Sequence, residues 1–155
     1  MNNPYISLFR ENYGVIENLG IVNFLITNAV HYTAALCAEN YGIIRRCYTV
    51  GELYCDSPNN SVIGALCAQS YGPWHPGGQS LIEDCYSKGT IVYGENNIII
   101  GGLIGHSGAL VRRCYSTIEL TGSWYAIGNL IGREGGNAVT LDCYCSDVGQ
   151  INEAA

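Results

Sequence analysis

Charged residues are scarce in this 155-residue sequence: they make up 13% of it, about half the share of an average globular domain. Only 7 residues are Lys or Arg, and the formal net charge is −6. Nucleic acids and anionic membranes bind basic surfaces, so we expect no nucleic acid as a partner. No apolar run approaches the roughly 18 residues that span a bilayer, so we expect no membrane insertion either.

Targeting signals and common catalytic motifs are also missing. The N-terminal MNNPYISLFREN has no basic stretch followed by an apolar one, which argues against a signal peptide in this segment. No Ser-His-Asp, His-Glu-x-x-His or phosphate-loop pattern occurs, and no Cys-x-x-Cys pair suggests a metal site. We therefore expect a protein that is not an enzyme, with no catalytic residue, no metal and no cofactor.

Glycine, tyrosine and cysteine are abundant instead, with 20, 12 and 8 residues. The apolar runs are short, rich in β-branched residues and bracketed by glycine, as in SVIGALCA, NIIIGGLIG and YAIGNLIG. None has the ten or more good helix formers that a helical repeat needs. This pattern predicts an all-β protein of short strands and tight turns.

Two anchors recur along the chain with nearly the same period. The Cys-Tyr pairs begin at Cys47, Cys85, Cys114 and Cys143, with Leu19-Gly20 as a degenerate first member, and their spacings are 28, 38, 29 and 29. A second anchor places leucine at Leu36, Leu66, Leu103 and Leu130. A period near 29, with one insertion of about nine residues, is typical of a solenoid. We predict a parallel β-solenoid, right-handed by the usual chirality of parallel crossovers, of about five coils with two or three strands each.

The repeat divides the chain into three parts. Residues 1–12 form a lead-in or partial coil, residues 13–147 the solenoid, and residues 148–155 a C-terminal tail. The extra residues form a loop insertion at 70–80, because a solenoid accepts insertions only at its turns. Met1 stands directly before the repeating pattern, so we expect a segment of a longer chain.

Equivalent residues of successive coils should stack into ladders, each rung about 4.8 Å from the next. The Cys-Tyr anchor then gives a cysteine ladder and, beside it, a tyrosine ladder with its hydroxyls at a wet edge. Its members are Cys47, Cys85, Cys114, Cys143, Tyr48, Tyr86, Tyr115 and Tyr144. Cysteine at such positions acts as a small core hydrophobe, and disulfides between adjacent coils are the alternative.

The two residues before each anchor alternate in charge from coil to coil. In chain order they are Glu17-Asn18, Arg45-Arg46, Glu83-Asp84, Arg112-Arg113 and Leu141-Asp142. Stacking would turn each neighbouring pair into an ion pair, and a slip by one coil would place like charges together. We interpret these charges as a device that specifies register. An extended strand would send Glu83 and Asp84 to opposite sides, which argues against a paired-carboxylate catalytic site.

Four residues at turns are candidates for ligand or partner contact. Trp74 and His75 lie between two prolines in the insertion, and Trp124 and Tyr125 lie at another turn. An exposed tryptophan on a rigid loop can stack on a sugar or anchor a partner protein. The alternative is that it covers a corner of the core.

The segments GGLIG at 101–105 and GNLIG at 128–132 resemble the GLUG motif, and CYST at 114–117 and CYSKG at 85–89 are similar to the Cys-Tyr-Ser segment of that family. The chain departs from the family pattern in having Arg or Asp where Asn usually precedes the cysteine. The resemblance implies a repeat of a bacterial surface protein, an adhesin-like chain or a non-catalytic part of a secreted peptidase. We thus expect a structural or adhesive segment, extracellular or at the cell surface, whose partner is a glycan or a cell-surface protein.

Two other functions remain open. Parallel β-helices also occur as polysaccharide-active enzymes, so the chain could be a fragment of one. A solenoid with open ends could also self-associate end to end.

Overall fold

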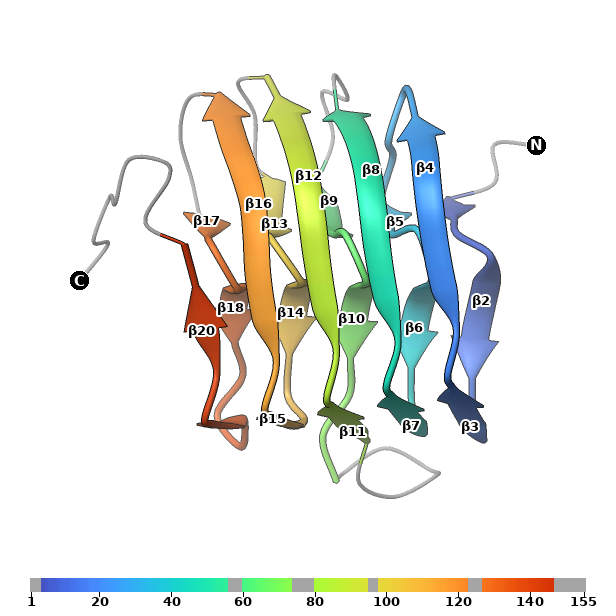
Figure 1. Ribbon diagram of the computed structural model, residues 1–155, viewed down its shortest axis with the longest axis vertical. Coiled ribbons are helices and arrows are strands. Elements are labelled where there is room, and N and C mark those ends of the chain that lie inside the picture. Colours follow the sequence, from blue (N-terminus) through green and yellow to red (C-terminus); the bar gives the residue numbers. More distant parts are fainter. Residues whose placement is uncertain (1–3, 56–59, 74–79, 95–97, 123–126, 147–155) are drawn as a thin grey trace.

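The computed structural model describes residues 4–55, 60–73, 80–94, 98–122 and 127–146. Within these ranges the chain forms 20 strands and no helix. The strands make four sheets of five, every pairing is parallel, and each sheet takes one strand from each of five successive coils (Figure 1). This confirms the parallel β-solenoid of about five coils. Each coil has four strands, however, where the sequence predicted two or three.

Each sheet is a column of equivalent strands in coil order. The first holds β1 (Tyr5–Ile6), β5 (Tyr32–Thr33), β9 (Ser61–Gly64), β13 (Ile98–Gly101) and β17 (Ile127–Gly128). The second holds β2 (Phe9–Asn12), β6 (Cys37–Asn40), β10 (Cys67–Ser70), β14 (Ile104–Ser107) and β18 (Ile131–Glu134). The third holds β3 (Val15–Glu17), β7 (Ile43–Arg45), β11 (Leu81–Glu83), β15 (Leu110–Arg112) and β19 (Val139–Leu141). The fourth, which has the longest strands, holds β4 (Gly20–Ile26), β8 (Tyr48–Cys55), β12 (Tyr86–Tyr93), β16 (Tyr115–Gly122) and β20 (Tyr144–Cys145).

The insertion lies at the corner between β10 and β11. Ser70 is in register with Ser107, and Leu81 is in register with Leu110. Three positions separate Ser107 from Leu110, whereas eleven separate Ser70 from Leu81. The coils before and after it therefore stack as if the extra residues were absent, which is why the period recovers beyond the insertion.

The core consists of aliphatic ladders that run along the solenoid axis. Leu36, Leu66 and Leu103 are fully buried, and so are the ladder residues Ile44, Ile82 and Val111. Each such side chain contributes roughly 1.5–3 kcal/mol by leaving water. In the last coil Leu130, the equivalent of Leu103, is only partly buried because just one neighbouring coil covers it, and Thr140, in register with Val111, is exposed.

A glycine ladder marks the corner between the first and second sheets. Gly64, Gly101 and Gly128 are in register, and a Cβ atom on Gly101 would overlap the backbone carbonyl of Ile104. The same overlap with the carbonyl three residues later occurs at Gly64 and Gly128. The Gly-x-Leu-Ile spacing is therefore required by a close backbone approach at this corner.

Candidate functional site

The corner before each cysteine anchor is made by a residue in the left-handed conformation. Asn18, Arg46, Asp84, Arg113 and Asp142 have φ between 50° and 55°. Asn and Asp adopt this conformation more readily than other residues with a side chain, whereas most others lose roughly 1–2 kcal/mol. Asn18, Asp84 and Asp142 therefore suit these corners. Arg46 and Arg113 adopt it at a cost, and each forms an ion pair with an acid of the preceding coil.

The first of these ion pairs joins β3 to the corner after β7. Arg45 Nε donates to Glu17 Oε2 at 2.6 Å, and Arg46 Nη2 donates to the same oxygen at 2.8 Å. Arg46 Nε also donates to Asn18 Oδ1 at 2.8 Å. One carboxylate thus holds both guanidinium groups of the next coil.

The second ion-pair cluster joins β11 to the corner after β15 and contains more charge. Arg112 Nε and Arg113 Nη2 donate to Glu83 Oε2 at 2.7 and 2.9 Å. Arg113 also holds Asp84 with both ends of its fork, from Nε to Oδ1 at 2.6 Å and from Nη2 to Oδ2 at 2.9 Å. The Glu83 side chain is only 11% exposed, so this cluster is shielded from solvent better than the first.

Two sequence-based expectations about these charges are wrong. Glu83 and Asp84 do not point to opposite sides, because the left-handed backbone at Asp84 turns its side chain back beside Glu83, and Arg113 contacts both. Nor does every junction form an ion pair: among the described residues, none joins Arg45 or Arg46 to the acids of the third coil, or the last two arginines to Asp142. Each arginine pair points to the acids of the preceding coil.

The ion pairs lower the pKa of all three carboxyl groups. The hydrogen bond from Arg45 lowers the pKa of Glu17, the bond from Arg112 lowers that of Glu83, and the bond from Arg113 lowers that of Asp84. These carboxylates are therefore charged and already occupied by arginine. Neither property suits a general acid, which needs a raised pKa.

The cysteine ladder lies just inside these corners. Cys47, Cys85 and Cys114 are buried, Cys143 is half-buried, and all are free thiols. Each Sγ donates to the carbonyl two residues earlier, at 3.1–3.3 Å, and lies 3.6–3.8 Å from a carbonyl of the preceding coil. The neighbouring Cys85 side chain lowers the pKa of Cys47 to about 7, while its two cysteine neighbours and burial raise the pKa of Cys85.

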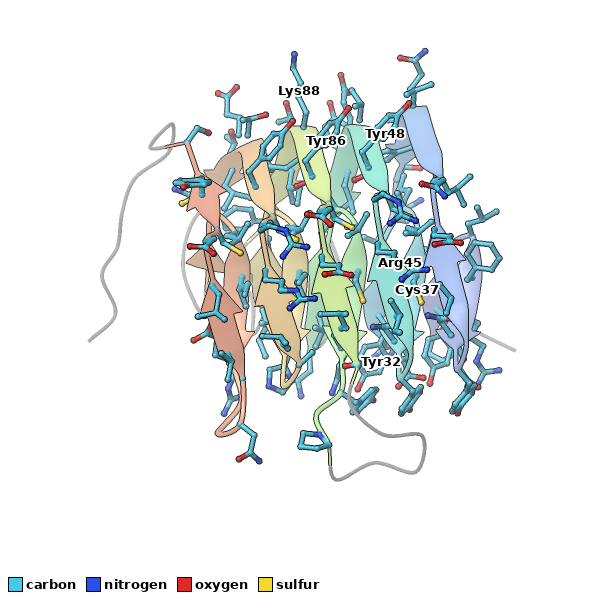
Figure 2. The ribbon with its side chains drawn as sticks, turned by 60° about the horizontal axis from the view of Figure 1, so that its bottom comes forward. Tyr32, Cys37, Arg45, Tyr48, Tyr86 and Lys88 are labelled. Atoms are coloured by element: carbon cyan, nitrogen blue, oxygen red, sulfur yellow. The ribbon has the colours of Figure 1, made fainter. Side chains whose placement is uncertain are left out.

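The tyrosine ladder stands on the outer side of the fourth sheet. The Tyr86 ring stacks on those of Tyr48 and Tyr115, with centroids 4.9 Å apart in both pairs, and Tyr144 continues the register. Figure 2 shows the rings of Tyr48 and Tyr86 side by side, with Lys88 projecting from the same face. The rings cover one another's faces and leave mainly edges and hydroxyls to solvent.

A second tyrosine stack, not predicted from the sequence, lies at the corner between the second and third sheets. Tyr41 stacks on Tyr13 at 4.7 Å and on Tyr71 at 4.4 Å. Inside it, Asn12 donates to Asn40 at 2.8 Å, and Asn40 donates to Ser70 at 3.1 Å. The signal was present, because Asn-Tyr-Gly at 12–14 and 40–42 and Ser-Tyr-Gly at 70–72 recur at the solenoid period.

The candidate contact residues Trp74, His75, Trp124 and Tyr125 lie outside the described residues. In the part of the chain that is described, no group of three or more His, Cys, Asp or Glu residues is arranged to hold a metal ion. The same part contains no helix long and apolar enough to cross a membrane.

Comparison with protein families, with curated proteins and with solved structures finds no match to this chain.

Proposed function

We propose that this chain is a GLUG-type, non-catalytic structural and adhesive repeat of a larger bacterial protein that is secreted or held at the cell surface. Its mechanism is geometric: the solenoid acts as a rigid spacer, and turns between strands carry recognition. The resemblance of GGLIG and GNLIG to the GLUG motif supports the family and the location.

The observation that carries the proposal is the continuous register of β8, β12 and β16 in the fourth sheet; the pairing of β4 with β8 has one shift, between Val22 and Phe24. All eight residues of β12 pair with consecutive residues of β8 on one side and β16 on the other. Such continuous ladders of main-chain hydrogen bonds resist bending between coils. The arginine clusters tie adjacent coils together at a second edge, which suits a load-bearing element.

The adhesive part of the proposal is tested by glycan-array binding of the wild type and of Trp74→Ala. Trp74 and His75 remain the sequence-based candidates, with Trp124→Ala as the matched variant at a different turn. We expect Trp74→Ala to remove binding to a glycan or cell-surface ligand without lowering the melting temperature. Unchanged binding in both variants would exclude both turns from recognition.

The non-catalytic part is tested by turnover on a panel of uronate polymers. A polysaccharide-active enzyme needs carboxylates that are free to act on substrate, whereas Glu17, Glu83 and Asp84 are each held by arginine. We expect no turnover. Product release that is lost in Glu52→Gln or Glu119→Gln, on the outer face of the fourth sheet, would establish the enzyme alternative instead.

A second candidate function is self-association through the ends of the solenoid. Large apolar side chains are exposed on the first coil, as at Val22 and Leu25, and on the last, as at Leu141 and Tyr144. Continuing the register of the second sheet into another copy would place Arg133 opposite Glu11 of that copy, with strands parallel throughout. Head-to-tail contacts of this kind do not close and give filaments.

Sedimentation velocity over a dilution series tests this candidate. We expect the mean size to rise with concentration, Arg133→Glu and Glu11→Arg to reduce it singly, and the combined charge swap to restore it. A strictly monomeric species at every concentration would refute it.

A further inference from the structure

The cysteine ladder combines a fixed spacing with apolar surroundings. Cys47, Cys85 and Cys114 occupy successive rungs, because Tyr86 N donates to Cys47 O at 3.2 Å and Tyr115 N donates to Cys85 O at 3.1 Å. Neighbouring sulfurs in such a ladder are separated by about one strand spacing, roughly 4.8 Å. A shorter ladder of the same kind pairs Cys37 with Cys67 in the second sheet.

This spacing is too wide for a disulfide. A bridge needs Cβ atoms about 3.5–4.5 Å apart and sulfurs about 2.05 Å apart. In-register parallel strands keep Cβ atoms nearly one strand spacing apart, so a bridge would have to pull two coils together. The free thiols of the structure agree with this reasoning.

The same spacing fits one metal ion between two sulfurs. A metal–thiolate bond of about 2.3 Å, doubled in a straight line, spans roughly 4.6 Å. We propose that the cysteine ladders bind soft monovalent cations, Cu(I) or Ag(I), each held linearly by the thiolates of two adjacent coils.

The surroundings favour this class of ion over zinc. Zinc takes four ligands in a tetrahedron, whereas among the described residues no group of three or more His, Cys, Asp or Glu is arranged to hold a metal ion. The next cysteine of the ladder lies one rung further along the same line, not around the gap between two sulfurs. Ile44, Ile82 and Val111 pack in the same core cluster as the cysteines. Soft thiolate ligands suit both Cu(I) and zinc among the first-row metals, and a site with only two ligands favours Cu(I).

The bound site carries one negative charge. Two thiols lose two protons and bind one monovalent cation, which leaves a bis-thiolate complex of charge −1. At the corner just outside the ladder, Arg45 and Arg46 share the single carboxylate of Glu17, so this cluster keeps one positive charge, whereas Arg112 and Arg113 are balanced by Glu83 and Asp84. Cys143, on the last rung, is the one member of this ladder that is only half-buried.

The ladders predict a stoichiometry. The ladder of four cysteines binds two ions, one between Cys47 and Cys85 and one between Cys114 and Cys143. The shorter ladder, Cys37 with Cys67, binds one more. Titration of the reduced protein with Ag(I), in a Cys145→Ser background that removes the exposed thiol, should therefore give three ions per chain. Zinc under the same conditions should give none, and X-ray absorption of the silver form should show two sulfur ligands per ion.

The decisive variant is Cys85→Ala in the same background. It leaves Cys47 without a sulfur neighbour, so the count should fall from three ions to two. The matched control is Cys55→Ala, which removes a buried cysteine that is in register with Tyr93 and belongs to neither ladder. It should keep three.

Three results would overturn the proposal: an unchanged count in Cys85→Ala, a zinc stoichiometry equal to that of silver, or an absorption spectrum with three or more ligands per ion. If Cys85→Ala does not fold, the number of sulfur ligands per silver ion in the Cys145→Ser protein, measured by X-ray absorption, still tests the proposal. The outcome is independent of the structural and adhesive role, which glycan binding tests separately.

Discussion

Replacing Thr49 with valine is expected to stabilise the protein. Thr49 lies in β8 with its side chain in the interior, and its Oγ1 has no hydrogen-bond partner; among the described residues it is the one buried side-chain polar atom in this state. A buried hydroxyl without a partner costs about 1–3 kcal/mol. Valine has the same shape and replaces the hydroxyl with a methyl group that gains from burial. We expect the free energy of unfolding to rise by about 1–2 kcal/mol.

Urea denaturation followed by circular dichroism measures the effect. With a slope of about 2 kcal/mol per M, typical of a chain of this size, the midpoint should rise by about 0.5–1 M. The matched control is Ser87→Ala, one rung away in register, because Ser87 Oγ donates to the Gly102 carbonyl at 2.7 Å. Removing that bond should lower stability by about 1 kcal/mol. A Thr49→Val variant that is no more stable than the wild type would refute the reasoning, since it would mean that the hydroxyl is satisfied in solution.

Three further predictions concern the corners and the core. Glu83→Gln should lower the free energy of unfolding by about 1–2 kcal/mol at pH 7, because it leaves two arginines without their shared carboxylate. The pKa of Glu83 is lowered in the folded protein, so its contribution to the free energy of unfolding is complete above the unfolded pKa of about 4.3 and is lost as pH falls through the folded pKa. Across that acid range, the free energy of unfolding of the variant should therefore depend less on pH than that of the wild type. Gly101→Ala should cost more than about 2 kcal/mol in thermal unfolding, since its Cβ would meet backbone, whereas Gly136→Ala, with open space around it, should cost little. Iodoacetamide with mass spectrometry should label Cys145 in the folded protein and the buried cysteines only on unfolding, and rapid labelling of Cys85 in native buffer would contradict the burial of the ladder.

Most of the fold follows from the sequence because a solenoid converts a linear period directly into spatial register. Cys85 and Cys114 are 29 positions apart in the chain and one rung apart in space, so aligning the repeats amounts to aligning the sheets. The same conversion places Leu66 beside Leu103 in the core without any knowledge of the turns. The number of strands per coil did not follow, because two-residue strands such as β17 leave too short a pattern to detect.

At the charged corners, the sequence predicted which residues stack but not which of them form ion pairs. Alternation along the chain predicted an ion pair at every junction, and the structure forms ion pairs at the first and third of the four. Charge and rung position are encoded in the repeat, but side-chain direction depends on backbone dihedral angles. The left-handed turn at Asp84 brings it beside Glu83 and sets both acids against Arg113.

The amino-acid order alone thus specified the period, the stacking partners and the identity of each rung, since these depend only on equivalent residues recurring at a constant interval. Three-dimensional packing decided the rest: the direction in which each arginine reaches, the close approach that requires Gly101, and the isolation of the Thr49 hydroxyl. These features arise where the chain turns a corner or closes around its interior, and there distances between residues remote in sequence determine the outcome.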